Sequence, residues 1–177
     1  FQAEDGIRDV AVTGVQTCAL LIWLRRALEI AEEGCVTMTK QVVLATRNAH
    51  KVGEVQRIIS ILTEEIEVLD LSDFPDCPEV VEDGTTFATN ALKKARTIAA
   101  HTKLPALADD SGICVDALNG MPGIFSARWA GGRDDQANLQ LLLDQLADVP
   151  DERRGGHFLA AIARFKQLLL SPKVLGH

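Results

Sequence analysis

Residues 41–71 read QVVLATRNAHKVGEVQRIISILTEEIEVLDL, and their pattern predicts a strand, a helix and a second strand. The valine-rich run 41–45 is typical of a buried strand, and Asn48 after it is a good helix N-cap. Residues 65–71 alternate as a second strand. Between the strands, apolar side chains at helical spacing predict an amphipathic helix over 49–62: Val52, Val55, Ile58, Ile59 and Leu62.

The rest of the sequence continues this alternation, which indicates an α/β fold with a partly parallel or mixed sheet. The further elements that we expect are a helix from Thr85 to about His101, a strand over 104–110, a turn at Ser111-Gly112, a strand over 113–118, a loop over 119–123, a helix capped by Asp134 or Asp135, and a strand over 157–165.

Composition narrows the class of protein. The 177 residues are 47% hydrophobic, which fits one globular domain. A net charge of -7 argues against nonspecific binding to nucleic acid, and the apolar run 11–24 falls short of the ~20 residues that span a bilayer. The four cysteines form no CxxC pair, which favours a reducing compartment. We therefore expect a cytoplasmic location, with no nucleic acid and no membrane as partners.

The first 37 residues are expected to lie outside the domain. The sequence begins at Phe1, and Met38 is its first methionine. The segment FQAEDGIRDVAVTGVQTCALLI resembles the translation of a sequencing-library adaptor, and a genuine amphipathic leader is the alternative. Residues 23–37 are either translated upstream sequence or a short helix. We therefore expect a non-native leader over 1–37 and a partial domain over 38–177.

The turn after the first strand could hold an anion. A helix N-terminus offers unpaired N–H groups and a partial positive charge, and here Thr46, Asn48 and Lys51 add polar and cationic side chains. The sequence lacks both glycines of the P-loop motif. Ordinary helix capping by Asn48 is the alternative, and His50 by itself is typical of a surface residue.

Asp109 and Asp110 end an apolar strand, where ligands bind in α/β sheets. Adjacent side chains on a strand point to opposite faces, so the two carboxylates would seldom face one ligand. A carboxylate here would suit Mg²⁺, which binds protein through one or two carboxylates and otherwise keeps waters and phosphate oxygens. The alternative is an Asx-turn followed by a hairpin glycine.

Two further segments contain charged residues that fit either a functional or a purely structural role. Residues 81–87 (VEDGTTF) lead into a helix with Lys93 and Lys94, but acids near a helix start and lysines on its surface are common. Residues 120–131 (GMPGIFSARWAG) place Arg128 beside aromatic residues, which also fits a rigid loop with a structural ion pair.

Taken in order, four segments resemble the inosine/xanthosine triphosphate pyrophosphatase family: VVLATRNAHKVGE, EDGTTFATNALKKA, LADDSGICVDALNGMPGIFSARWAG and the leucines after Asn138. The resemblance covers Met38 to about Phe158. It implies a mixed central sheet flanked by helices in two lobes, a fold shared with Maf-type pyrophosphatases. It also implies Mg²⁺-dependent hydrolysis of ITP, dITP or XTP to the monophosphate and pyrophosphate, by a homodimer.

The resemblance also implies roles for individual residues. Asp110 matches the general base, which is also a metal ligand, and Glu82 matches the second metal carboxylate. Lys94 matches a phosphate contact, and Ser111 matches a substrate contact beside the base. The triphosphate loop of the family matches the six residues Thr46, Arg47, Asn48, Ala49, His50 and Lys51.

The sequence departs from the family at two places. Arg47 stands where many relatives carry glycine. The aromatic-Gly-Tyr-Asp-Pro and Ser-His-Arg segments, which supply much of the base pocket in the family, do not occur here. We therefore expect a domain that is incomplete at its C-terminus. The rival interpretations are a Maf-type pyrophosphatase and a fragment that binds nucleotide phosphates without turnover.

Overall fold

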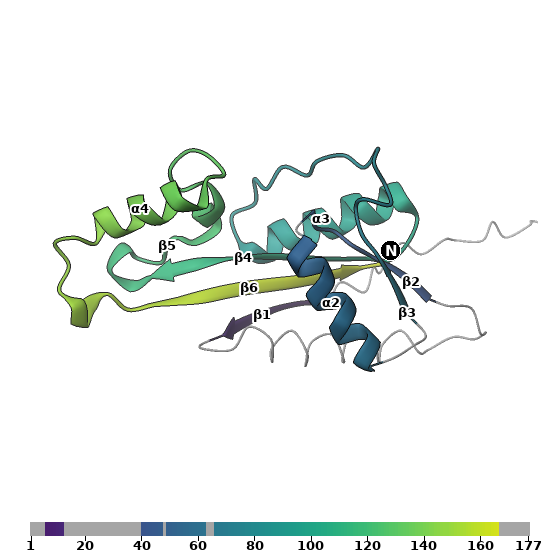
Figure 1. The fold of residues 1–177 in the computed structure, drawn as a ribbon, viewed down its shortest axis with the longest axis horizontal. Helices are drawn as coiled ribbons and strands as arrows, with labels where there is room; N and C mark the ends of the chain where they lie inside the picture. Colours follow the sequence, from purple (N-terminus) through teal and green to yellow (C-terminus); the bar gives the residue numbers. More distant parts are fainter. Residues whose placement is uncertain (1–5, 13–39, 48, 63–65, 167–177) are drawn as a thin grey trace, which may run out of the picture.

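The computed structural model describes residues 6–12, 40–47, 49–62 and 66–166. One sheet with the strand order β1-β6-β4-β2-β3 runs through the molecule, and a short strand, β5, also pairs with β4 (Figure 1). Its strands are β1 (Gly6–Val12), β2 (Lys40–Leu44), β3 (Ile66–Leu69), β4 (Ala106–Val115), β5 (Met121–Pro122) and β6 (Gly156–Phe165). β2 is parallel to β3 and β4, whereas β6 is antiparallel to β4 and β1. The sheet is therefore mixed, as predicted.

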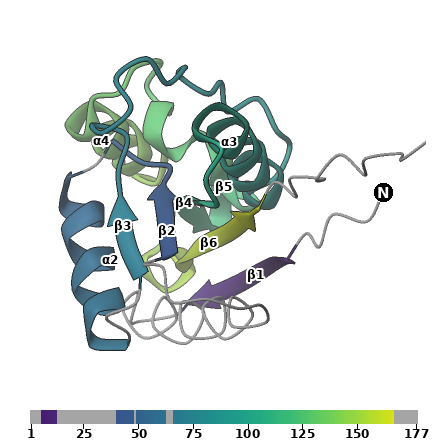
Figure 2. The same ribbon diagram turned by 90° about the vertical axis from the view of Figure 1, so that its right-hand side faces the viewer.

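Among the described residues, three α-helices flank the sheet: α2 (Ala49–Leu62), α3 (Phe87–Thr102) and α4 (Asp135–Gln145). Figure 2 shows α2 and α3 on opposite sides of the strands. In Figure 1, α4 and β5 lie at one end of the long strands β4 and β6, and α2, β2 and β3 lie at the other. The 3₁₀ helices η1 (Asp116–Leu118), η2 (Gly123–Arg128) and η3 (Asp151–Arg153) connect the elements of the α4 end. This arrangement is the two-lobed α/β fold that the sequence predicts.

Alternation along the strands separates a core under α3 from a core under α2, and a third, smaller cluster joins Val115 of β4 to Leu142 and Leu146. Ala106 and Ala108 of β4 belong to the core under α3, whereas Leu107 between them belongs to the core under α2. The same alternation holds on β6, where Ala161 and Ala163 lie in the α3 core and Ile162 in the α2 core. The side on which a β4 residue points therefore decides which helix it can contact.

The helix predictions agree closely with the structure. α2 has the bounds that the periodicity predicts, although its expected cap Asn48 lies outside the described residues. α3 starts two residues later than expected, because Thr86 and Thr89 form a capping box. Asp134, one of the two expected caps of α4, accepts hydrogen bonds from the N–H groups of Gln136 and Ala137.

The predicted turn at Ser111-Gly112 is wrong. Residues 106–115 form one strand, and β6 pairs with it along its whole length without a bulge. Gly112 serves close packing instead of a turn, since a Cβ there would lie 2.4 Å from the Gly123 carbonyl oxygen and from Ser126 Oγ. The expected second strand over 113–118 is likewise the end of β4 followed by η1.

The outer edge of β6 has a strand partner. Residues 6–12 form β1 and pair antiparallel with β6, from Gly6 opposite Arg164 to Val12 opposite Phe158. The short helix considered for 23–37 lies outside the described residues. That residues 1–37 form a leader stays a prediction. Within the described part of the chain, no helix is both long enough and apolar enough to span a bilayer.

Candidate active site

Two carboxylates and one ammonium group form a cluster on the α3 face of the sheet. The Lys94 ammonium donates to Glu82 Oε1 at 2.9 Å and lies 3.9 Å from Asp110 Oδ1. The three side chains keep only 15%, 24% and 12% of their surface exposed, in the order Lys94, Glu82 and Asp110. Three residues assigned from the sequence thus meet at one largely buried point.

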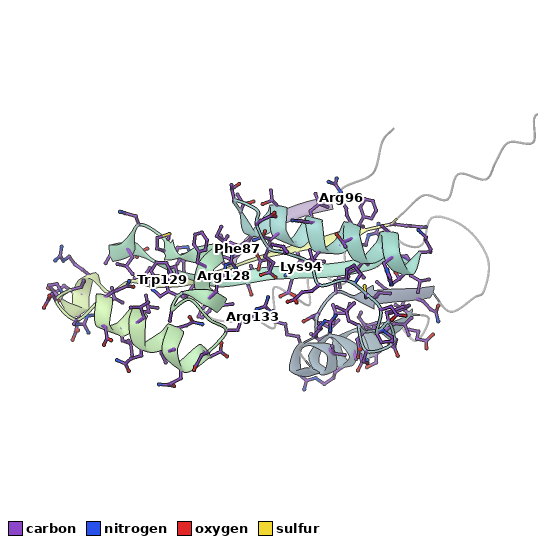
Figure 3. The ribbon with its side chains drawn as sticks, turned by 90° about the horizontal axis from the view of Figure 1, so that it is seen from above. Phe87, Lys94, Arg96, Arg128, Trp129 and Arg133 are labelled. Atoms are coloured by element: carbon purple, nitrogen blue, oxygen red, sulfur yellow. The ribbon has the colours of Figure 1, made fainter. Side chains whose placement is uncertain are left out.

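Each member of the cluster is placed by a different element. Asp110 is the fifth residue of β4, on the same face as Ala106 and Ala108. Lys94 lies two turns into α3, and Glu82 lies in the loop before that helix. Arg128 of η2 reaches the same loop, donating to the Glu82 carbonyl oxygen at 3.0 Å. In Figure 3, Lys94 and Arg128 both lie over the middle of the molecule, between α3 and α4.

The surroundings of Asp110 change its proton affinity. Burial raises the pKa of this carboxyl above its ordinary value, and the nearby charges of Glu82 and Asp109 act in the same direction. The amide of Asn90 and the ammonium of Lys94 favour the ionised form but do not reverse the effect. A carboxylate with a raised pKa accepts a proton more readily than an exposed one, which suits a general base.

A second group lies on the α2 face. Lys51, in the first turn of α2, donates to Asp109 Oδ2 at 2.5 Å. The sequence analysis assigned Lys51 to phosphate binding, whereas Asp109, its partner, was not assigned to the site. The only signal for this contact in the sequence is the alternation along the strand, which turns Asp109 away from Asp110.

The turn between β2 and α2 runs alongside β4. The Ala45 N–H donates to the Leu107 carbonyl oxygen at 2.7 Å, and the Thr46 N–H donates back to Leu44 at 2.8 Å. Exposed Arg47 reaches across to the loop before α3 and donates to the Cys77 carbonyl oxygen at 3.2 Å. Asn48 and the side chains of Ala49 and His50 lie outside the described part, so their assignments stay predictions.

Part of one edge of β4 has no neighbouring strand. β2 pairs with β4 at Ala106 and Leu107, and β5 pairs with it at Cys114 and Val115. Between them, no strand in the described ranges pairs with residues 109–113 on this side. The Ile113 N–H donates to Ser126 Oγ of η2 at 3.0 Å, and we call the remaining residues 109–111 the open edge. The Lys51–Asp109 pair and the cluster around Lys94 both border the open edge, because Asp109 and Asp110 are the first two residues of that edge.

Ser111 also lies on the open edge. It is exposed, and its N–H donates to Asp110 Oδ1 at 3.1 Å. The unbroken register of β4 turns its side chain toward the face of Asp109. The structure thus places Ser111 next to the cluster, and its contact with a substrate stays a prediction.

Asn90 is a member of the site that the sequence analysis did not assign. It is buried on α3, one turn before Lys94, and its amide donates to Asp110. The spacing of four residues between Asn90 and Lys94 indicates that both lie on one helix face. The strand residue that Asn90 and Lys94 contact depends on how α3 packs against β4, and the sequence pattern does not predict that packing.

Comparison with known proteins identifies close relatives. Residues 42–174 match the sequence profile described as the Ham1 family. A dITP/XTP pyrophosphatase of Streptomyces coelicolor is 55% identical over 124 residues, which are 70% of this chain and 62% of that protein. A protein of the same name from Leifsonia xyli is 56% identical over 124 residues, covering 70% of this chain and 60% of the relative. The chain thus spans about three fifths of the length of these curated relatives.

Solved structures show the same fold. The crystal structure of a nucleoside-triphosphatase (dITP/XTP pyrophosphatase) from Mycobacterium abscessus superposes with a TM-score of 0.60 at 49% identity, covering 70% of this chain and 64% of that one. A HAM1 protein from Coxiella burnetii superposes with a TM-score of 0.66 at 39% identity, covering 72% of this chain and 64% of that one.

Proposed function

Because the chain belongs to the Ham1 family, we propose that it carries the phosphate-binding and acid–base residues of a nucleoside triphosphate pyrophosphatase. The proposed substrates are ITP, dITP and XTP, and the products are the monophosphate and pyrophosphate. The observation that carries the proposal is the cluster of Glu82, Lys94 and Asp110 beside the β2–α2 turn at the open edge of β4. The names of the curated relatives support the choice of substrates.

The triphosphate is proposed to lie at the turn over residues 46–51. A 14-residue helix begins there, and its first N–H groups favour an anion. Lys51 in the first turn of the helix supplies a positive charge beside the open edge. Arg47 adds a second cation at the same turn. The remaining residues proposed for this loop are Thr46, Asn48, Ala49 and His50, with Ser111 on the facing edge of β4.

The donor set fits a magnesium ion. Mg²⁺ is bound in proteins by one or two carboxylates and completes its shell with water and substrate phosphate oxygens. Glu82 and Asp110 are two such carboxylates, and both face the Lys94 ammonium. No group of three or more His, Cys, Asp or Glu side chains suited to a metal occurs among the residues described. We propose that Glu82 and Asp110 hold the ion, which when bound neutralises phosphate charge.

The protein side chains would then divide the remaining chemistry. Asp110 takes a proton from the attacking water. The oxygen of that water bonds to the α-phosphorus, and the bond from the α-phosphorus to the oxygen that bridges it to the β-phosphate breaks, which releases pyrophosphate. Lys94 and Lys51 are placed to stabilise the charge that grows on the departing pyrophosphate. The raised pKa of Asp110 supports the role of base. A homodimer in the cytoplasm is the proposed setting, without nucleic acid or membrane.

The experiment compares the chain as it stands with a chimera that continues into the C-terminal segment of the Streptomyces coelicolor relative. Pyrophosphate release is measured with Mg²⁺ from ITP, dITP, XTP and GTP. We expect the chimera to release pyrophosphate from the first three and at least tenfold less from GTP.

A folded chimera that releases pyrophosphate from none of the four would contradict the proposal. Nucleotide binding without release would favour the alternative of a phosphate-binding protein. A preference for GTP over the other three nucleotides would favour the Maf-type alternative. Activity of the unextended chain would show that residues 1–177 suffice.

A further inference from the structure

Asn90 is a polar side chain inside the core, with only 1% of its surface exposed. Burying an amide is costly unless its groups are hydrogen-bonded. Both ends of this amide have partners: Oδ1 accepts the N–H of Gly84 at 2.7 Å, and Nδ2 donates to Asp110 Oδ2 at 2.9 Å. The amide therefore joins the loop that carries Glu82 to the strand that carries Asp110.

The orientation of this amide follows from its partners. A backbone N–H can only donate and an ionised carboxylate can only accept, so the oxygen must face Gly84 and the nitrogen must face Asp110. Gly84 lets the loop approach this closely, since a Cβ there would lie 2.6 Å from Asn90 Oδ1 and 2.5 Å from Thr89 Oγ1. Asn90 cannot rotate its amide without losing both bonds.

The two oxygens of Asp110 consequently have different environments. Oδ2 is engaged by the buried amide. Oδ1 accepts the Ser111 N–H and faces the Lys94 ammonium, on the side of Glu82. We propose that Asn90 is a positioning residue, whose amide fixes the Asp110 carboxylate so that Oδ1 is the oxygen presented to the reaction. This inference rests on the function proposed above.

The kinetic test uses Asn90→Asp, in whichever of the two proteins above hydrolyses ITP. This variant keeps the size of the side chain and the acceptor for Gly84, and it replaces the donor toward Asp110 by a second carboxylate oxygen. Because the geometry of the base is lost while the phosphate contacts remain, kcat should fall about 100-fold and KM should change less than threefold.

The matched control is Thr86→Ala. It removes the N-cap of the same helix and contacts neither carboxylate, so it should lower stability without a comparable fall in kcat. An equal fall in kcat for both variants would show a merely structural role for Asn90. Full activity of Asn90→Asp would overturn the inference.

A second measurement depends neither on turnover nor on the folding of the Asn90 variant. In the full chain, NMR should show that the Nδ2 protons of Asn90 exchange with water far more slowly than those of exposed Asn119. Asp110→Ala should speed this exchange at least tenfold, whereas Glu82→Gln should leave it slow. Equal exchange in the chain and in Asp110→Ala would overturn the inference even if the pyrophosphatase proposal held. If neither protein hydrolyses ITP, the proposed function fails and this measurement still decides the role of the Asn90 amide.

Discussion

Asp109 and Asp110 follow one another in β4 and bind cations from opposite sides of the sheet: Asp109 contacts Lys51 of α2, and Asp110 faces Lys94 of α3. The alternation of side chains along a strand makes this division unavoidable. The open edge of β4 nevertheless begins at both residues. One bound triphosphate could thus reach a cation from each face of the sheet there.

Replacing the proposed base tests the chemistry directly. Asp110→Asn keeps the size of the side chain but removes the proton acceptor, so hydrolysis of ITP should fall at least 1,000-fold. Circular dichroism should show an unchanged fold. A rate close to that of the original protein would exclude Asp110 as the base.

The same substitution should change the dependence of stability on pH. Burial raises the folded-state pKa of Asp110 above 3.8, so the ionised group opposes folding at neutral pH. With EDTA present, the Tm of Asp110→Asn at pH 7 should therefore exceed that of the original chain. The difference should shrink as the pH falls through the raised pKa and should level off only well below pH 3.8, where the acid is protonated in both the folded and the unfolded state. A difference that does not change with pH would contradict this assignment.

Lys51 is predicted to act mainly in substrate binding. A charge-assisted hydrogen bond contributes about 1.5–3 kcal/mol, so Lys51→Ala should raise the KM for ITP about tenfold or more. It should lower kcat by a smaller factor, because Lys51 also stabilises the charge on the departing pyrophosphate. Lys166→Ala removes an equal charge from an exposed position at the end of β6 and should leave KM unchanged. Steady-state kinetics at fixed ionic strength makes the comparison, and an unchanged KM for Lys51→Ala would remove it from the phosphate site.

Lys94 and Lys93 offer a matched pair for stability. Lys94 contacts two largely buried carboxylates, of which Glu82 also lies 3.8 Å from Arg128, whereas Lys93 pairs with exposed Asp83. Lys94→Ala should lower the free energy of unfolding by about 1.5–3 kcal/mol, and Lys93→Ala should change it little. Millimolar Mg²⁺ should restore part of the loss in Lys94→Ala, because binding to the folded state stabilises it. Equal urea midpoints for the two variants would show that the Lys94 ammonium does not offset the negative charge of Glu82 and Asp110.

Two glycines should respond to alanine with opposite signs. At Gly112 a Cβ would collide with η2, so Gly112→Ala should destabilise the chain by about 1–3 kcal/mol. At Gly53, in α2, nothing lies within 4 Å of the added carbon, and Gly53→Ala should stabilise the chain by about 0.5–1 kcal/mol. Thermal unfolding measures both, and a neutral Gly112→Ala would show that η2 does not pack on β4.

Much of the architecture could be predicted because its signals are local. The periodicity of residues 49–62 and the cap at Asp134 depend on neighbours within one or two helical turns, and both predictions are confirmed. The order of the elements predicted a partly parallel or mixed sheet, and the structure shows that it is mixed. The turn at Ser111-Gly112 failed because the dipeptide is equally compatible with a strand in which glycine admits another segment, here η2.

The family resemblance assigned the residues of the cluster but not their partners. Glu82, Lys94 and Asp110 were each assigned from the sequence, and the structure brings them together. Asn90 acquires its contact through the packing of α3 on β4, and Asp109 through the packing of α2 on β4. No spacing within a single element contains that information, so Asn90 was not assigned and Asp109 remained a candidate without a partner.

The contacts of the site differ in how far they reach along the chain. Glu82 and Lys94 are 12 residues apart and Asn90 and Asp110 are 20, whereas Lys51 and Asp109 are 58 residues apart. Closing a longer loop costs more chain entropy, and distant pairings form more slowly. The carboxylate cluster can therefore assemble early, as α3 meets β4. The contact between Lys51 and Asp109 can form only after β2 has paired with β4. We therefore expect the cluster of Glu82, Lys94 and Asp110 to form before the phosphate-binding turn is in place.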